Sequence, residues 1–304
     1  MSNQGLTPGA TDSPEASPDP ELGGKVSWDL VIRPAGGWFD WRLGDFLRHR
    51  DLLWLLVWRD FVTLHKQTIL GPLWHVINPL LTALTYSLIF GRVVKIPTDG
   101  LPPVLFYLAG TVAWNYFTAC LYKTANSLAG NAGLFGKVYF HRLIVPLSAV
   151  LSSLISFGIQ CAIFALLAVF FAWRGYPVQP NSWLLAWPLL VAMLAGYGLA
   201  LGLICSALTT RYRDLGQIVG FATQLLMYAT PVIYPLAYAR KASYGWVMEC
   251  NPLAAVIETF RHAALGHGSV ELIWLGVSAA ILAGLLLLGV TLFTRAERTF
   301  IDTV

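Results

Sequence analysis

Aromatic side chains recur at helical spacing within the apolar stretches of this chain, which contains 12 Trp, 12 Tyr and 16 Phe. Residues three, four or seven positions apart lie on one side of a helix. Sugars present C–H faces to aromatic rings and hydroxyl groups to tyrosine and amide side chains, so such faces predict an uncharged lining for a sugar chain. Alternatively, the rings serve helix packing and membrane interfaces, where Trp and Tyr gather. The predicted lining comprises Tyr86 and Phe90; Tyr107, Trp114 and Phe117; and Phe221, Gln224 and Tyr228.

A group of three charges separates two apolar runs: Arg211, Arg213 and Asp214. Charges at the end of an apolar run ordinarily anchor a span at the membrane surface, and this is the simpler interpretation. A functional interpretation makes Arg211 and Arg213 a cytoplasmic pivot under the following span. In that role the two side chains would contact a partner protein, lipid phosphates or the phosphates of a substrate. The sequence leaves these interpretations open.

Several kinds of chemistry are missing from the sequence. We find no ionisable side chain near the middle of an apolar stretch, where ion-coupled carriers usually place one. The stretch from Gly130 to Val138 fails the phosphate-loop pattern at both ends, and no HExxH, GxSxG or paired intramembrane carboxylates occur. The four cysteines lack CxxC spacing, so we expect no metal site or disulfide framework. We therefore expect no catalytic residue or cofactor in this chain, and any nucleotide hydrolysis must come from a partner.

The composition indicates an integral membrane protein, because 56% of the 304 residues are hydrophobic and 12% are charged. Soluble domains average about 45–50% apolar and about 25% charged residues. The net charge of +4 suits a protein near anionic lipids rather than a nucleic-acid binder. A helix needs about 20 apolar residues to cross a bilayer. Six stretches qualify as spans, and they cover 73–91, 103–122, 143–172, 183–208, 217–236 and 271–293.

The distribution of Lys and Arg predicts how the six spans are oriented. These residues concentrate before the first span, between the second and third, between the fourth and fifth, and after the sixth. The positive-inside rule therefore places both termini in the cytoplasm. Residues 1–43 contain no apolar core segment, and their first part is rich in Pro, Ser and Gly. This composition predicts a disordered or extended cytoplasmic tail.

Three segments outside the spans have helical patterns. In the first, 44–68, an apolar stripe predicts a helix in the cytoplasmic interface, with Arg59 on its polar side. The second, 123–142, is longer than a turn and predicts a small cytoplasmic helix. The third, within 237–269, predicts a short outer helix with an apolar face, with Glu258 and Arg261 on its other sides, and a functional role there would be an outer gate. The stripe of the first segment consists of Phe46, Leu53, Trp54, Val57, Trp58, Phe61 and Leu64.

Six motifs follow one another between about Asp45 and Val304: "RDLLWLLVWRDF", "KQTILGPLWHVINPL", "NAGLFGKVYFHRLIVPLS", "RYRDLGQIVGFATQLLMYATPVIYP", "NPLAAVIETFRHAALG" and "RAERTFIDTV". In these motifs and their order the chain resembles the membrane-spanning permeases of ATP-binding-cassette polysaccharide exporters, the type-2 permeases that move O-antigen, capsule or teichoic-acid polymers. The resemblance implies an all-α, six-span domain over 69–304 in the bacterial inner membrane. It further implies a homodimer with two ATPase subunits that bind ATP and Mg, and an undecaprenyl-diphosphate-linked glycan as substrate.

The resemblance also implies roles for particular segments. Spans one, two and five would line the channel, 126–140 would be the coupling helix received by the ATPase, and the segments near 237–264 would be outer gate helices. His141 stands where this family commonly has Pro, and Leu64-His65 stands where it commonly has "RYK", so the details of coupling can differ here. The residues implied to contact the ATPase are Asn131, Phe135, Lys137, Tyr139, His141, Arg142 and Arg59.

These observations predict the channel-forming subunit of an ATP-driven exporter of lipid-linked polysaccharide, with O-antigen as the first candidate and teichoic-acid or capsule polymers as alternatives. A membrane-embedded transferase acting on lipid-linked sugars is a second hypothesis, but the short cytoplasmic loops offer Asp214 alone as a surface carboxylate. An exporter of small molecules within the wider type-2 group is a third hypothesis. The aromatic faces and the "ERTFIDTV" tail favour polymer export.

Overall fold

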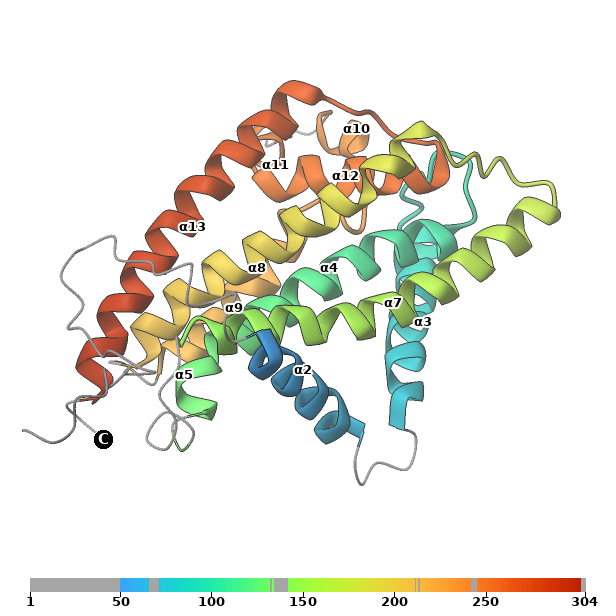
Figure 1. Ribbon diagram of the computed structural model, residues 1–304. Helices are drawn as coiled ribbons and strands as arrows, with labels where there is room; N and C mark the ends of the chain where they lie inside the picture. Colours follow the sequence, from blue (N-terminus) through green and yellow to red (C-terminus); the bar gives the residue numbers. More distant parts are fainter. Residues whose placement is uncertain are drawn as a thin grey trace, which may run out of the picture. The chain divides into compact units, whose positions relative to one another are not determined.

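A computed structural model describes residues 50–65, 71–131, 133, 142–210, 212, 214–241 and 245–301, and within these ranges the chain forms helices and no strands. The predicted tail, 1–43, lies outside the described residues. Figure 1 shows the helices along the chain. The α-helices are α2 (Arg50–His65), α3 (Trp74–Tyr86), α4 (Pro103–Ala125), α5 (Ser127–Gly130), α7 (Ile144–Trp173), α8 (Trp187–Thr209), α9 (Leu215–Tyr228), α10 (Leu236–Ala239), α11 (Gly245–Glu249), α12 (Pro252–Leu265) and α13 (Leu272–Ile301). Shorter helical turns are η1 (Gly71–Leu73), η2 (Ser87–Val93, a π-helix) and η3 (Ser182–Ala186).

Five helical segments among the described residues are long and apolar enough to cross a membrane, and they match five of the six predicted spans. The predicted fifth span, 217–236, is too long. Its helix, α9, has 14 residues and ends at Tyr228, so at 1.5 Å per residue it reaches about 21 Å, short of the roughly 30 Å hydrocarbon core. Pro231 follows the helix and has no N–H with which to continue it. The five segments are Trp74–Val93, Pro103–Ala125, Ile144–Trp173, Ser182–Thr209 and Leu272–Ala296.

The central helix of the domain is α4. In the most apolar 18-residue stretch of α4, 78% is buried inside the protein, whereas the corresponding share is 17% in α7 and 17% in α13. Two glycines four residues apart on α8 let it approach α4 closely: a Cβ at Gly198 would lie 2.5 Å from Cys120 Cβ, and one at Gly202 would lie 2.5 Å from Thr124 Cβ. Small residues at this spacing are a common device for packing helices in membranes, where the hydrophobic effect does not drive helix association. In Figure 1, α8 runs between α4 and α13.

The amphipathic helix predicted before the first span is present as α2, but its apolar residues are divided between two faces. Leu56 and Val57 are buried, and Leu56 packs against Ile144 at the start of α7. By contrast, Trp54 is 71% exposed and Trp58 is 60% exposed. The single predicted stripe is therefore wrong, because packing on α7 selects one part of it and leaves the two indole rings outside. Residues 44–49 and 66–68 of the predicted helix lie outside the described residues.

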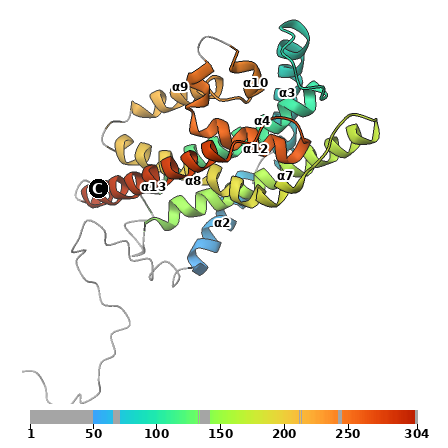
Figure 2. The ribbon, with the colours of Figure 1, turned by 90° about the horizontal axis from the view of Figure 1, so that it is seen from above.

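The connection between α9 and α13 contains α10, α11 and α12. The helix expected there with polar sides is α12, and most of its residues are buried, including Glu258 and Arg261, which are 2% and 1% exposed. The expectation that these two charges face away from the packed side is therefore wrong. The helix contacts α4, α8, η3, α11 and α13, which together cover the sides that carry the two charges. Figure 2 shows α9 and α10 on one side of α4, with α2 and α7 on the other.

Candidate functional site

The exposed face of α9 carries amide and aromatic side chains in alternation. Gln217, Phe221, Gln224 and Tyr228 follow one another at spacings of four, three and four, so they lie on one side of the helix. All four are exposed, with Phe221 at 64% and Tyr228 at 50%. The helix has a single fully buried side chain, Thr223. The predicted lining did not include Gln217, although this residue falls on the same helical spacing as Phe221, Gln224 and Tyr228.

Tyr86, on the first predicted span, meets the C-terminal end of α9. The Tyr86 hydroxyl lies 3.9 Å from Met227 Sδ. Tyr86 also packs edge-on against Phe90, with ring centroids 5.7 Å apart, and against Tyr107 at 6.3 Å. The structure thus brings Tyr86 and Phe90, both half-buried, to the end of the helix that exposes Tyr228.

The predicted aromatic residues of α4 occupy the interior. Tyr107 and Phe117 are 0% exposed and Trp114 is 5% exposed. Trp114 and Phe117 pack on each other with centroids 5.1 Å apart. In this structure the three rings hold helices together, which is the alternative interpretation of the aromatic pattern, and a lining built by this chain rests on α9 and on Tyr86 and Phe90.

Two residues that the family resemblance places against the ATPase lie together at one end of the domain. Arg59 Nη2 on α2 donates a hydrogen bond to Asn131 Oδ1, 3.1 Å away, just after α5. Arg59 also pairs with Asp60 at 2.7 Å. Arg142 is half-buried immediately before α7. The remaining residues predicted for coupling or for the pivot lie outside the described residues: Phe135, Lys137, Tyr139, His141, Arg211 and Arg213.

A fully buried charge pair lies where α9 ends. Arg261 Nη1 donates to Glu258 Oε2 at 2.9 Å, and its guanidinium carbon lies 4.1 Å from the centroid of the Phe106 ring. Arg261 Nη2 donates to the carbonyl oxygen of Pro231 at 2.5 Å. Burial raises the pKa of the Glu258 carboxyl above its ordinary value, and the adjacent Arg261 guanidinium opposes that rise. The sequence signal available for this pair was an acid and a base three residues apart in an otherwise apolar helix.

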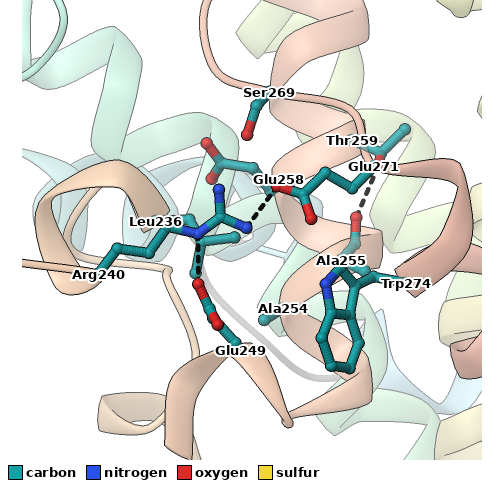
Figure 3. A pocket seen from close by; sticks show the side chains of 10 residues that line it. All are labelled: Leu236, Arg240, Glu249, Ala254, Ala255, Glu258, Thr259, Ser269, Glu271 and Trp274. Atoms are coloured by element: carbon teal, nitrogen blue, oxygen red, sulfur yellow. Dashed lines mark hydrogen bonds and ion pairs between the residues drawn. The ribbon is translucent and has the colours of Figure 1, made fainter. Parts of the chain in front are cut away.

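A second charge cluster lies nearer the surface of the same connection, and Figure 3 shows it. Arg240 Nε lies 2.5 Å from Glu249 Oε1, and its Nη2 donates to Glu271, immediately before α13. Trp274 lines the same small pocket. One guanidinium therefore joins the segment after α10, the helix α11 and the beginning of α13. Among the described residues, no group of three His, Cys, Asp or Glu side chains is placed to hold a metal ion.

Comparisons with known proteins agree with the helical arrangement. An O-antigen export system permease protein, RfbA, from Klebsiella pneumoniae is 27% identical over 257 residues, which cover 83% of this chain and 94% of that protein. RfbA from Myxococcus xanthus is 25% identical over 261 residues, covering 86% and 98%. The polysialic acid transport protein KpsM from Escherichia coli is 22% identical over 238 residues, covering 77% and 89%. These relatives confirm the resemblance to polysaccharide export permeases. Because residues 51–265, most of the chain, match the family described as ABC-2 type transporter, the protein belongs to that family.

Proposed function

We propose that this protein is the channel-forming permease subunit of an ATP-driven exporter that moves lipid-linked polysaccharide, with O-antigen as the first candidate, from the cytoplasm across the inner membrane. Its ATP would be hydrolysed by a separate ABC ATPase, two copies of which would bind a homodimer of permeases. The observation that carries the proposal is the exposed face of α9, where Gln217, Phe221, Gln224 and Tyr228 alternate in type.

This face suits a long polar polymer. Aromatic rings contact the C–H faces of sugars, and the amides of Gln217 and Gln224 exchange hydrogen bonds with hydroxyl groups. The face carries no charge, so no single position on it would bind a sugar residue tightly enough to stop the chain from sliding. The lipid tail would remain in the bilayer while the glycan follows the face. Similarity to RfbA proteins supports O-antigen, and similarity to KpsM makes a capsule polymer the second candidate.

The packing of α9 supports the pairing of two copies. Thr223 is its one fully buried residue, while Ile218 and Leu225 are 56% and 53% exposed. A helix this exposed needs another surface, and an exposed apolar patch commonly marks a contact with another protein or a membrane. In a two-fold pair, the two α9 helices would face each other across a channel.

Contacts near the other end of the domain support a route for coupling to ATP hydrolysis. Leu56 packs α2 onto Ile144 of α7, and Arg59 bonds Asn131 beside α5. A displacement of the 126–140 segment by the ATPase would therefore move α2 and the start of α7 together. In this proposal both chain termini and these contacts lie on the cytoplasmic side.

The test is restoration of surface polysaccharide in a strain that lacks its own O-antigen permease and expresses this chain with its ATPase. We expect Phe221→Ala and Tyr228→Ala to lower surface polymer while the ATPase still co-purifies with the permease. The matched control is Trp173→Ala, which removes an aromatic side chain that is 83% exposed on α7. Wild-type export by both α9 variants would rule out this face as a channel wall. No export by the wild-type chain, although it is assembled with its ATPase, would contradict polysaccharide as the substrate.

A further inference from the structure

The segment that follows α9 is held by side chains from the region of α12. Asn251, immediately before α12, donates its amide hydrogen to the carbonyl oxygen of Ala229 at 3.1 Å. Arg261 donates to the carbonyl oxygens of Pro231 at 2.5 Å and Val232 at 3.3 Å. These carbonyls lie past the end of the helix, so they have no intrahelical partner. Within a membrane such groups must be satisfied by protein, and Asn251 and Arg261 do this.

The position of Arg261 carries a cost that its ion pair does not offset by itself. The side chain is 1% exposed, and its partner Glu258 is 2% exposed. Moving two charges from water into the protein interior commonly costs as much free energy as their mutual attraction recovers. A protein with well-packed apolar residues in place of such a pair is therefore often as stable. What an apolar pair cannot do is donate hydrogen bonds to backbone carbonyls. The planar guanidinium reaches the carboxylate and the two carbonyls at once, and this linking role distinguishes Arg261 from a packing residue.

The surroundings of the pair leave little room for independent movement. A Cβ on Gly110 of α4 would lie 2.5 Å from the Val232 carbonyl oxygen and 3.2 Å from Arg261 Nη2. On the other side of the pair, the backbone of Leu236, at the start of α10, lies close enough to the Glu258 carboxylate to lower its pKa and so oppose the rise caused by burial. The Arg261–Glu258 pair therefore contacts α4, the end of α9 and the start of α10.

We propose that Arg261 is the positioning residue of the outer gate: its guanidinium holds the outer end of α9 closed against α12 and α4, and the exit opens when its bonds to the Pro231 and Val232 carbonyls break. This inference rests on the proposed function, because it treats α9 as the wall of the channel. Arg261 itself lies behind that wall and contacts no substrate.

The test uses the permease–ATPase complex in vesicles, with the four native cysteines replaced by Ser and Tyr228→Cys as the reporter. A membrane-impermeant maleimide is added from the outer side. With Arg261 present, we expect the labelling rate to differ about fivefold or more between the nucleotide-free and ATP-trapped states, the size of an ordinary coupling effect. With Arg261→Met, we expect fast labelling in both states. The matched control is Arg240→Met, which removes an arginine from the same connection and should keep the nucleotide dependence.

A second variant separates the geometry of Arg261 from its charge. Arg261→Lys keeps a cation beside Glu258, but one ammonium group cannot serve the carboxylate and both carbonyls in the planar arrangement. We expect labelling of this variant in the nucleotide-free state to be faster than in the wild type. Nucleotide-dependent labelling at the wild-type rates in Arg261→Met or Arg261→Lys would overturn the proposal.

A measurement on the unsubstituted complex covers the case in which neither variant assembles. Amide hydrogen exchange over 232–239 should be slow in the nucleotide-free state, because Val232 and Leu236 are buried and the Tyr238 N–H donates to the Pro235 carbonyl oxygen. In the ATP-trapped state the exchange should be faster. Fast exchange in the nucleotide-free state would overturn the proposal. If labelling depends on Arg261 as expected but the permease with Tyr228 and the native cysteines gives no surface polymer, the proposed substrate is wrong and the gate role stands. If polymer export and labelling are both unchanged in Arg261→Met, the gate role alone is wrong.

Discussion

Replacing Leu56 by Ala tests whether α2 and α7 form one mechanical unit. Leu56 is 2% exposed and belongs to a small apolar cluster with Ile144 and Val145. Truncating a buried leucine costs about 2–5 kcal/mol. Leu55 is the matched control, because it is the neighbouring leucine on the same helix and is 63% exposed. At an exposed position the same truncation usually changes stability by about 0.5 kcal/mol or less.

These energies convert into a measurable difference in how often α2 leaves α7. At about 1.4 kcal/mol per tenfold change, a loss of about 2 kcal/mol raises the undocked population roughly 30-fold. We expect amide exchange in 50–65 of the Leu56→Ala complex to accelerate by about that factor, and we expect ATP hydrolysis to continue while polysaccharide export falls. The Leu55→Ala variant should exchange within about twofold of the wild type. Equal exchange rates in the two variants would refute the docking of α2 on α7 as described.

Two further predictions concern helix packing and the Arg59 contact. Gly198→Ala places a Cβ 2.5 Å from Cys120 Cβ, so we expect a loss of about 1–3 kcal/mol of stability, seen as a lower unfolding temperature in detergent. Gly216→Ala, which meets nothing within 4 Å, should leave that temperature unchanged or raise it. A double-mutant cycle of Arg59→Ala and Asn131→Ala should give a coupling of about 0.2–1 kcal/mol in ATPase binding, because this contact is largely exposed and screened. Strict additivity of the two single variants would remove the contact as a coupling element.

The sequence predicts the helical class and five of the spans because long apolar runs are recognised by length alone. Hydropathy failed at the fifth predicted span for a physical reason. Thr230, Pro231, Val232 and Ile233 are all buried, three of them are apolar, and they begin two residues after the end of α9. A residue buried against protein and one buried in lipid have the same hydropathy. Hydropathy therefore does not predict that the helix ends at Tyr228, because it does not include the side chains near α12 that donate hydrogen bonds to the carbonyl oxygens after α9.

The aromatic pattern shows a similar limit. Helical spacing correctly groups residues on one side of a helix, but it cannot say whether that side meets another helix or an opening. Trp114 and Phe221 have the same kind of pattern, yet one is 5% and the other 64% exposed. The difference arises because α4 is surrounded by α3, α7, α8 and α12, whereas α9 contacts α8 as its main neighbour. Partner helices far along the chain decide which aromatic residues remain available to a polymer.

The burial of Glu258 and Arg261 on α12 is connected with the early end of α9. An acid and a base on a short helix outside the spans ordinarily face water, and the helical spacing predicts Glu258 and Arg261 on sides other than the apolar face. The structure buries both, and Arg261 donates to the carbonyl oxygens of Pro231 and Val232, which lie past the end of α9 and have no intrahelical donors. The early end of α9 and the buried arginine are therefore connected: a short α9 leaves carbonyl oxygens without helical donors, and Arg261 donates hydrogen bonds to them.

A chain in which α9 continued as a regular helix through residue 236 would have no need of a charge at position 261. Restoring that helix by replacing Pro231 with Ala should make Arg261 costly rather than useful, which a stability comparison of Arg261→Met with and without Pro231→Ala would measure.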